Sequence, residues 1–407
     1  MPAATPTASR ADRPTSYDLA AFAPVTGAEE EWRFTPVEKL SALLGSDFAP
    51  GAFSVTVVDA CPHAANSASP VRVERVGRDD PRLGLTPAPS DRAAAAAWAG
   101  FGEATVITVP DGAIVDGPVH VRCRGTGGTG PSPSASHLAV IAGPRSQATV
   151  ILDYAGHAEL AETVELHVGE GARLRVLAIH DWDMTAIHTS SHRARLEKDA
   201  SLVHGAVTLG GGLVRLTPDV VFAGPGGSAE MLGLALTDTG QHHEARLFVD
   251  HAAPHCTSRV TYKGALQGAG AHSVWVGDVL IRKDAVGTDT YEENRNLVLV
   301  RGARADSVPN LEIETGEIRR AGHASATGRF DDEQVFYLRS RGIDLATARR
   351  LVVHAFFAEL IGRLGVSEVT ERLTASVDRS LEAAMMKAGL AEGPAPYANQ
   401  PEEHTRP

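Results

Sequence analysis

Hydrophobic and polar residues alternate with a period of two through most of the middle of the chain. Between about Thr105 and Ile318, short runs of valine, leucine and isoleucine are separated by glycine and aspartate, as in TVITV, VHVRC, VELHV and RLRVL. Such alternation is typical of β-strands, and no stretch of this region has a helical period of useful length. The middle of the chain is therefore predicted to be almost entirely β.

A loose repeat accompanies this alternation. A turn residue is followed by a small residue three positions later and by another residue two further on, at starts 143, 169, 197 and 226, which lie 26 to 29 residues apart. Similar groups start at Gly268 and Gly302, after wider intervals. A period of this length indicates stacked units, and units made of strands without helices favour a parallel β-helix. A β-sandwich with chance glycine spacing stays open as the alternative.

The period changes to that of a helix after Ile318. Three helices are predicted there from capping residues and terminal glycines. Their expected starts are Asp331, Asp344 and Ser367, and the first and third are expected to end near Gly342 and Gly389. A small helical domain should therefore follow the β-helix.

The remaining segments complete a mainly β organisation with an N-terminal α/β segment and a C-terminal helical domain. An alanine-rich stretch is predicted to form a short helix capped by Ser90 or Asp91. Both chain ends are rich in proline, alanine and charge, which is typical of disordered tails. The expected parts are a disordered tail at 1–16, a mixed helical segment at 17–100, a parallel β-helix at 101–322, a helical domain at 323–391 and a second disordered tail at 392–407.

Composition and charge disfavour several classes of function. The 407-residue chain carries a net charge of -12, whereas a general nucleic-acid or anionic-membrane surface needs dense lysine and arginine. No apolar run reaches the roughly 20 residues of a membrane span, and the first residues lack the hydrophobic core of a signal peptide. A soluble cytoplasmic protein that binds neither nucleic acid nor membrane is expected.

Familiar catalytic motifs are missing. The sequence has no P-loop, no HExxH and no GxSxG, and its glycine-rich stretches lack the strand-turn-helix context of a dinucleotide-binding fingerprint. The three cysteines, Cys61, Cys123 and Cys256, lie too far apart for a CxxC metal site. An enzyme is therefore not expected.

Histidines, 17 in all, are notably numerous and are candidate ligands. In the group DHAAPHC, His251, His255 and Cys256 could supply nitrogen and sulfur to a transition metal, or could be plain hydrogen-bonding groups of a β-helix wall. His323 stands alone among small residues, and is expected between the last strand and the first C-terminal helix. Its small neighbours leave the ring uncrowded, which would suit a site shared with another chain.

Three blocks between Asp250 and Ile343 resemble one known family. DHAAPHCTSRVTYKGALQGAGAHSVWVG, NRNLVLVRGARADSVPNLEIE and GHASATGRFDDEQVFYLRSRGI are similar to the SufB/SufD family of iron-sulfur cluster assembly proteins, and more closely to its SufD side. EEEWRFTP near the start also resembles the family's N-terminal block. The resemblance implies a right-handed parallel β-helix between helical ends, in agreement with the repeat.

The resemblance also implies partners and a cargo. The family forms a SufB-SufD heterodimer that joins two copies of the ABC ATPase SufC, so a SufB-like paralogue and a SufC-like ATPase are the expected partners, with a homodimer as the alternative in isolation. ATP would be bound by SufC and not by this chain. An iron-sulfur cluster would be held transiently and shared with SufB. The implied SufC-docking region is the C-terminal helical domain, with candidate contacts at Asp331, Asp332, Glu333, Phe336, Tyr337, Arg341 and Phe356.

One histidine position is associated in the family with cluster formation at the SufB interface, and here it is His323. SufB-like chains carry a scaffold cysteine shortly before this block, whereas residues 289–320 contain none, which places the chain on the SufD side. Many SufD-like chains read Cys-Ser-His at the motif, and this one reads Ala321-Gly322-His323. Two roles follow from the resemblance: a scaffold that ligates the cluster through His323, or a purely architectural adaptor for SufC with no metal ligand of its own.

Overall fold

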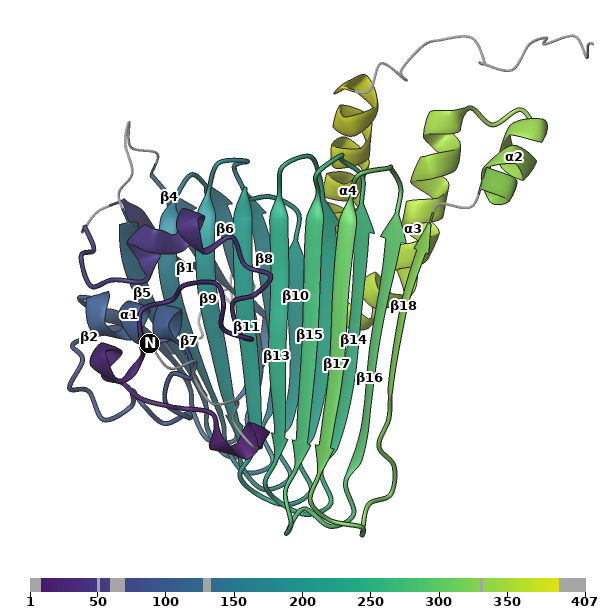
Figure 1. The fold of residues 1–407 in the computed structure, drawn as a ribbon. Helices are drawn as coiled ribbons and strands as arrows, with labels where there is room; N and C mark the ends of the chain where they lie inside the picture. Colours follow the sequence, from purple (N-terminus) through teal and green to yellow (C-terminus); the bar gives the residue numbers. More distant parts are fainter. Residues whose placement is uncertain (1–8, 50–51, 59–69, 127–132, 330–331, 388–407) are drawn as a thin grey trace, which may run out of the picture.

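Two nine-stranded sheets lie face to face, and the chain passes from one to the other after almost every strand (Figure 1). The computed structural model describes residues 9–49, 52–58, 70–126, 133–329 and 332–387. Strands two apart in the sequence pair in parallel and in register, as β8 does with β6 and β10. The predicted parallel β-helix is therefore confirmed, and the β-sandwich alternative is wrong.

The strands divide between the two sheets as follows. Sheet A contains β1 (Phe53–Val58), β4 (Ile114–Gly125), β6 (Gln147–Gly156), β8 (Arg173–Trp182), β10 (Ser201–Thr208), β12 (Ser228–Thr237), β14 (Thr257–Leu266), β16 (Asp289–Val298) and β18 (His323–Arg329). Sheet B contains β2 (Arg72–Val76), β3 (Ala104–Val109), β5 (Pro133–Ala142), β7 (Glu159–Val168), β9 (Ile187–Leu196), β11 (Leu213–Phe222), β13 (His242–His251), β15 (His272–Ile281) and β17 (Arg304–Ile313).

The helices lie before and after the solenoid, apart from one at its first coil. They are η1 (Arg10–Asp12), η2 (Leu19–Ala21), η3 (Val37–Leu43), α1 (Arg92–Gly100), α2 (Asp332–Ser340), α3 (Leu345–Leu364) and α4 (Ser367–Lys387). Asp91 caps α1 by accepting a hydrogen bond from the Ala94 N–H, so Asp91 and not Ser90 is the cap. Asp344 caps α3 in the same way, as predicted. Ser367 is the first residue of α4 rather than its cap, and Gly389 lies outside the described residues.

In-register pairing places inward-facing side chains of successive coils one above another in the space between the two sheets. Ala148, Leu174 and Leu202, for example, are in register on β6, β8 and β10 and belong to the hydrophobic cluster that fills the interior. Full burial of each such side chain stabilises the fold by about 1.5–3 kcal/mol relative to exposure. The two-residue period places the remaining side chains on the outer faces, which the terminal segments cover.

One row of turns, from each strand of sheet B to the next strand of sheet A, explains the glycine repeat. The turns from β3–β4 through β15–β16 each contain a residue with positive φ, whose N–H donates to a carbonyl one coil further on; these residues are Gly112, Arg145, Gly171, Asp199, Gly226, His255 and Gly287. The predicted repeats starting at 143, 169, 197 and 226 lie in this row. Gly268 and Gly302 lie in the opposite row, from sheet A to sheet B, which accounts for the wide interval before Gly268.

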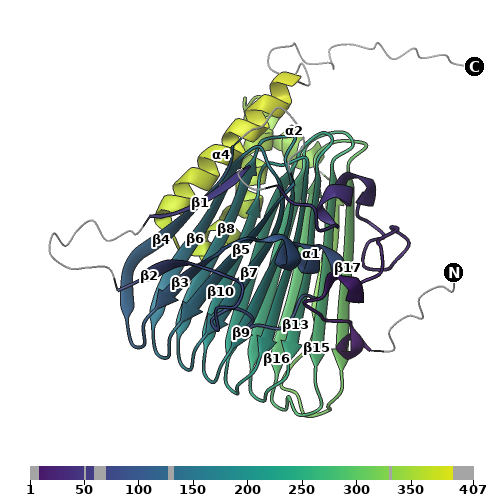
Figure 2. The same ribbon diagram turned by 90° about the vertical axis from the view of Figure 1, so that its left-hand side faces the viewer.

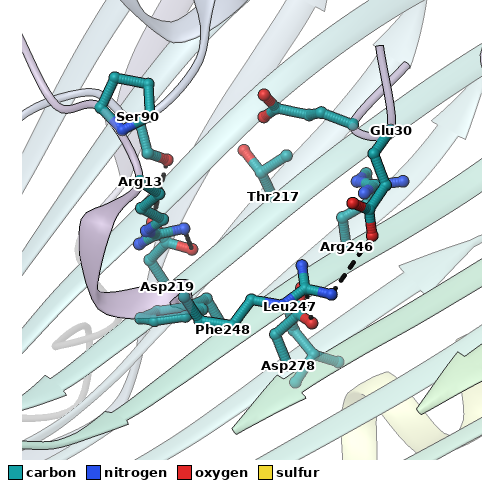
Figure 3. A pocket seen from close by; sticks show the side chains of 12 residues that line it. Arg13, Glu30, Ser90, Thr217, Asp219, Arg246, Leu247, Phe248 and Asp278 are labelled. Atoms are coloured by element: carbon teal, nitrogen blue, oxygen red, sulfur yellow. Dashed lines mark hydrogen bonds and ion pairs between the residues drawn. The ribbon is translucent and has the colours of Figure 1, made fainter. Parts of the chain in front are cut away.

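The N-terminal segment runs over the outer face of sheet B. Residues 9–16, expected from composition to be a disordered tail, instead pack there: the Ser9 hydroxyl donates to Glu312, and Arg13 pairs with Asp219 at 2.7 Å beside a cavity of about 160 Å³ (Figure 3). Long-range ion pairs, which composition does not reveal, fix this segment. Residues 1–8 and the predicted tail at 392–407 lie outside the described residues.

The C-terminal helices α3 and α4 pack on the outer face of sheet A (Figure 2). Leucines and valines of both helices form a second buried cluster with outward residues of β8, β10 and β12, such as Leu177, Val207 and Leu232. The helical part begins at Asp332, because residues 323–329, which the sequence assigned to it, form β18. The solenoid therefore extends further along the chain than predicted.

Buried histidines predict an acid-sensitive fold. Burial lowers the pKa of His180, His192, His204, His243 and His251 between the sheets, to about 4 for His204 and His243 and to about 3 for His251. The unfolded chain takes up these protons near pH 6.5, whereas the folded chain does not. Stability should thus fall from pH 6.5 toward pH 4, with each histidine contributing up to about 1.4 kcal/mol per pH unit.

Melting temperatures of His251→Gln measured between pH 7 and pH 5 test this expectation. Glutamine can keep the hydrogen bond that His251 makes with Ser258 at 2.9 Å, but it cannot titrate. The variant should lose less stability on acidification than the unsubstituted chain. His255→Gln, which changes an exposed imidazole, is the control and should keep the original slope. Equal slopes for His251→Gln and the unsubstituted chain would contradict the assignment.

Candidate functional site

The solenoid differs at its two ends. At the N-terminal end the edge strands β1 and β2 pair antiparallel with β4 and β3. At the C-terminal end β17 and β18 are the last strands of their sheets, and the described residues supply no further strand to pair with them. Backbone N–H and C=O groups along such an edge are free to pair with another chain.

His323 is the first residue of β18 and therefore lies at this open end. The prediction that it sits between the last strand and the first helix is wrong, because it pairs in register with Glu292 of β16. Residues in register on parallel strands point to the same face, and the Glu292 side chain points inward, toward Gly277 of β15. His323 is thus on the inner face of the last coil, where it is exposed.

Backbone bonds to β16 hold the segment before His323. The N–H of Thr290 donates to the Arg320 carbonyl at 2.9 Å, and the N–H of Glu292 donates to the Gly322 carbonyl at 3.0 Å. Arg320 also pairs with Asp289 at 3.2 Å, and Ala321 packs against the interior cluster. The main chain that carries the imidazole is therefore well fixed, although the imidazole itself is exposed.

Glu292 is a site residue that the sequence analysis missed. It is only 1% exposed, and within the described residues no hydrogen-bond donor reaches either carboxylate oxygen. Burial, together with the nearby carboxylate of Asp278, raises the pKa of Glu292 to about 8. A buried acidic side chain without a hydrogen-bond donor among the described residues therefore lies one strand away from His323.

Other polar groups line the interior next to Glu292. The Asn296 amide donates to Asn294 at 2.9 Å, to Ser307 at 2.9 Å and to Thr327 at 3.2 Å, which ties β16 to β17 and β18. Asn294 and Asn296 also line a small interior cavity of about 30 Å³. The inner face of β16 carries Thr290, Glu292, Asn294 and Asn296 in succession, and this run of alternate polar residues was the available sequence signal.

The group DHAAPHC does not gather its candidate ligands. His251 is buried and stacks on Phe222, with ring centroids 4.6 Å apart. His255 occupies a left-handed turn position, where its N–H donates to Val286. The Cys256 thiol is buried within 3.5 Å of the Gly224 carbonyl, and burial raises its pKa. Throughout the described ranges, no three histidine, cysteine, aspartate or glutamate side chains converge as a metal site.

The candidate docking residues lie on α2 and α3. Phe336 and Tyr337 are 74% and 55% exposed, and the Arg341 guanidinium lies 4.8 Å from the Tyr337 ring. Phe356 is partly buried against the cluster between α3 and sheet A. Asp332 and Glu333 form the start of α2, and Asp331 lies outside the described residues. Among the described helices, none is long and apolar enough to cross a membrane.

Comparisons with known proteins agree with this architecture. The family model for the SUF system FeS cluster assembly, SufBD core domain, matches residues 124–356. An iron-sulfur cluster assembly SufBD family protein of Mycobacterium tuberculosis is 52% identical over 377 residues, which are 90% of this chain and 92% of that protein. The Mycobacterium leprae protein of the same description is 50% identical over 376 residues, or 90% of this chain and 93% of that protein.

A more distant relative is the iron-sulfur cluster assembly protein SufD of Escherichia coli. It is 27% identical over 216 residues, which are 53% of this chain and 51% of that protein. The matched core runs from the end of β4 through the open end of the solenoid and into α3, so it includes His323 and Glu292. With more than half of the sequence covered by one family model and close relatives along nine tenths of it, the chain belongs to the SufBD family of iron-sulfur cluster assembly proteins.

Proposed function

We propose that this chain is the SufD-like scaffold subunit of a SUF machine, in which it pairs with a SufB-like paralogue and binds a SufC-like ABC ATPase. A nascent iron-sulfur cluster is built where the two β-helices meet, and ATP is bound by the ATPase. The position of His323 at the uncovered end of the solenoid carries this proposal. In this role the chain is not an enzyme, and its place of action is the cytoplasm.

The open end is suited to receive a second β-helix. Strands β17 and β18 present backbone groups that an incoming strand can pair with, and edge pairing of this kind gives main-chain affinity without a deep pocket. Ile313 on β17 and Tyr291 on β16 are 43% and 36% exposed there, and would supply apolar area to an interface. The opposite end differs, because its edge strands β1 and β2 run antiparallel to the strands that they pair with.

His323 would contribute a neutral ring nitrogen to iron, while thiolates and sulfide come from the partner. A cluster that is cargo has to be released, so few and exchangeable ligands from each chain are an advantage. The fixed main chain around Gly322 would hold the imidazole at a constant depth in the interface. In this arrangement neither chain alone has a complete set of ligands.

The C-terminal helices would couple the ATPase to the solenoid. Lys263 of β14 bonds to the Phe356 carbonyl at 3.0 Å, Arg363 of α3 pairs with Glu230 of β12 at 2.9 Å, and Arg175 of β8 donates to the Leu364 carbonyl at 2.6 Å. A displacement of α3 would therefore act directly on three strands of sheet A. The exposed aromatic residues of α2 are the proposed point of attachment.

The variant His323→Ala tests the ligand role. It should still assemble with the SufB-like and SufC-like partners, because the backbone bonds of β18 do not depend on the imidazole. Iron and acid-labile sulfide in the complex purified without oxygen should fall by at least about tenfold, as expected for loss of a metal ligand. Ser325→Ala, two residues further on the same face, is the matched control. Unchanged cluster content in His323→Ala would favour the purely architectural adaptor.

The double variant Phe336→Ala/Tyr337→Ala tests the docking surface. Burying both rings in an interface would contribute about 1.5–3 kcal/mol for each, so co-purification of the ATPase should drop at least about tenfold. The melting temperature should hardly change, because both side chains are mostly exposed. Met184→Ala removes an equally exposed apolar side chain from a distant turn and should bind the ATPase normally. Full ATPase recovery by the double variant would place the docking surface elsewhere.

A further inference from the structure

We propose that Glu292 and His323 together form a binding site for one divalent first-row transition-metal ion at the open end of the solenoid. The inference rests on the proposed role of His323 and adds a second ligand to it. In an iron-sulfur cluster assembly protein, the natural occupant would be ferrous iron.

The register of the last coil places the two side chains next to each other. Glu292 and His323 are directly paired on adjacent parallel strands, which lie about 4.8 Å apart. The hydrogen bond from the Glu292 N–H to the Gly322 carbonyl fixes this pairing at 3.0 Å. Both side chains extend from the same inner face. The Glu292 carboxylate, which two methylene groups carry away from the backbone, and the His323 imidazole can therefore reach a common ion.

The Glu292 carboxylate has no other role among the described residues. Its side chain is buried, and neither oxygen receives a hydrogen bond. The nearby amides of Asn294 and Asn296 are used by Tyr262, Ser307 and Thr327. A buried carboxylate without a donor is costly unless a proton or a cation satisfies it. Glu292 lies on β16, and β18 is the only described strand that follows it in sheet A.

The chemistry of the two side chains suits a cation. Asp278 lies on β15 near Glu292, but Arg10 pairs with it from the outer face at 3.3 Å and offsets its charge. No arginine or lysine among the described residues pairs with Glu292 itself. One imidazole nitrogen and one carboxylate oxygen suit ferrous, manganous and cobaltous ions. Two protein ligands leave positions open for groups from a partner chain.

Gly277 provides the space that the carboxylate occupies. A Cβ atom built at Gly277 would lie 2.8 Å from Oε1 of Glu292 and 2.5 Å from the Trp275 ring. Only glycine at this position lets the carboxylate lie between β15 and β16 without a clash. The glycine of the opposite sheet thus allows the Glu292 carboxylate to approach the β15 backbone closely.

Titration of the isolated full chain with Co²⁺, under anaerobic conditions and followed by visible absorption, tests the site. Glu292→Gln and His323→Ala should each weaken binding by at least about tenfold, the effect expected for one lost ligand. The double variant should bind at least as weakly as the worse single variant, because both ligands of the one ion are then lost. Glu293→Gln is the matched control, since this neighbour faces outward and pairs with Arg295. Fe²⁺ competition against Co²⁺ should follow the same order.

Melting curves establish that each variant is folded, and Glu292→Asp, which keeps a shorter carboxylate, should bind with intermediate affinity. Wild-type affinity in Glu292→Gln, or absence of saturable Co²⁺ binding by the unsubstituted chain, overturns the inference. If His323→Ala loses cluster content while Glu292→Gln keeps full Co²⁺ affinity, the proposed function stands and the inference falls. If Glu292→Gln loses Co²⁺ while His323→Ala keeps both Co²⁺ and clusters, both the shared site and the proposed ligand role of His323 are wrong.

Discussion

In-register hydrogen bonding between successive coils is the interaction on which the rest of this molecule depends. Every inner strand of the two sheets has a partner on both sides, and the same register stacks the interior side chains. Among the described strands, only the edge strands β1, β2, β17 and β18 have a partner on one side alone. The open end is therefore a property of the architecture, and whatever lies on β18 is placed where a second chain can reach it.

The polar groups of the solenoid walls impose a second constraint. Arg215 of β11 is buried on the outer face of sheet B, where it pairs with Asp91 at 2.6 Å and lies 3.9 Å from the Trp32 ring centre. Such a charge is tolerated only when it is paired, so the N-terminal segment has to cover this wall. The N-terminal and C-terminal segments thus cover opposite faces, and the end of the stack stays accessible between them.

Features with a local cause could be predicted from the sequence, and features with a distant cause could not. Alternation and turn spacing indicated the β-helix, and Asp344 was recognised as a cap because its bond spans three residues. The small residues of HASATGR have no clear alternation of hydrophobic and polar positions, so the sequence did not predict β18. Its pairing with β16 is what makes it a strand. Glu292 was overlooked because its importance lies in its position opposite His323, which depends on the register between two coils.

The anchors of α3 on β8, β12 and β14 have a mechanical consequence. These three contacts hold strands of sheet A that are hydrogen-bonded to β10 and β16. All five strands therefore belong to one continuous sheet. A load applied through the helix is distributed over several coils, and no single turn has to yield. The solenoid should therefore move as one rigid body when the helices move. A small rotation at the helices then becomes a larger displacement at the far edge of the last coil.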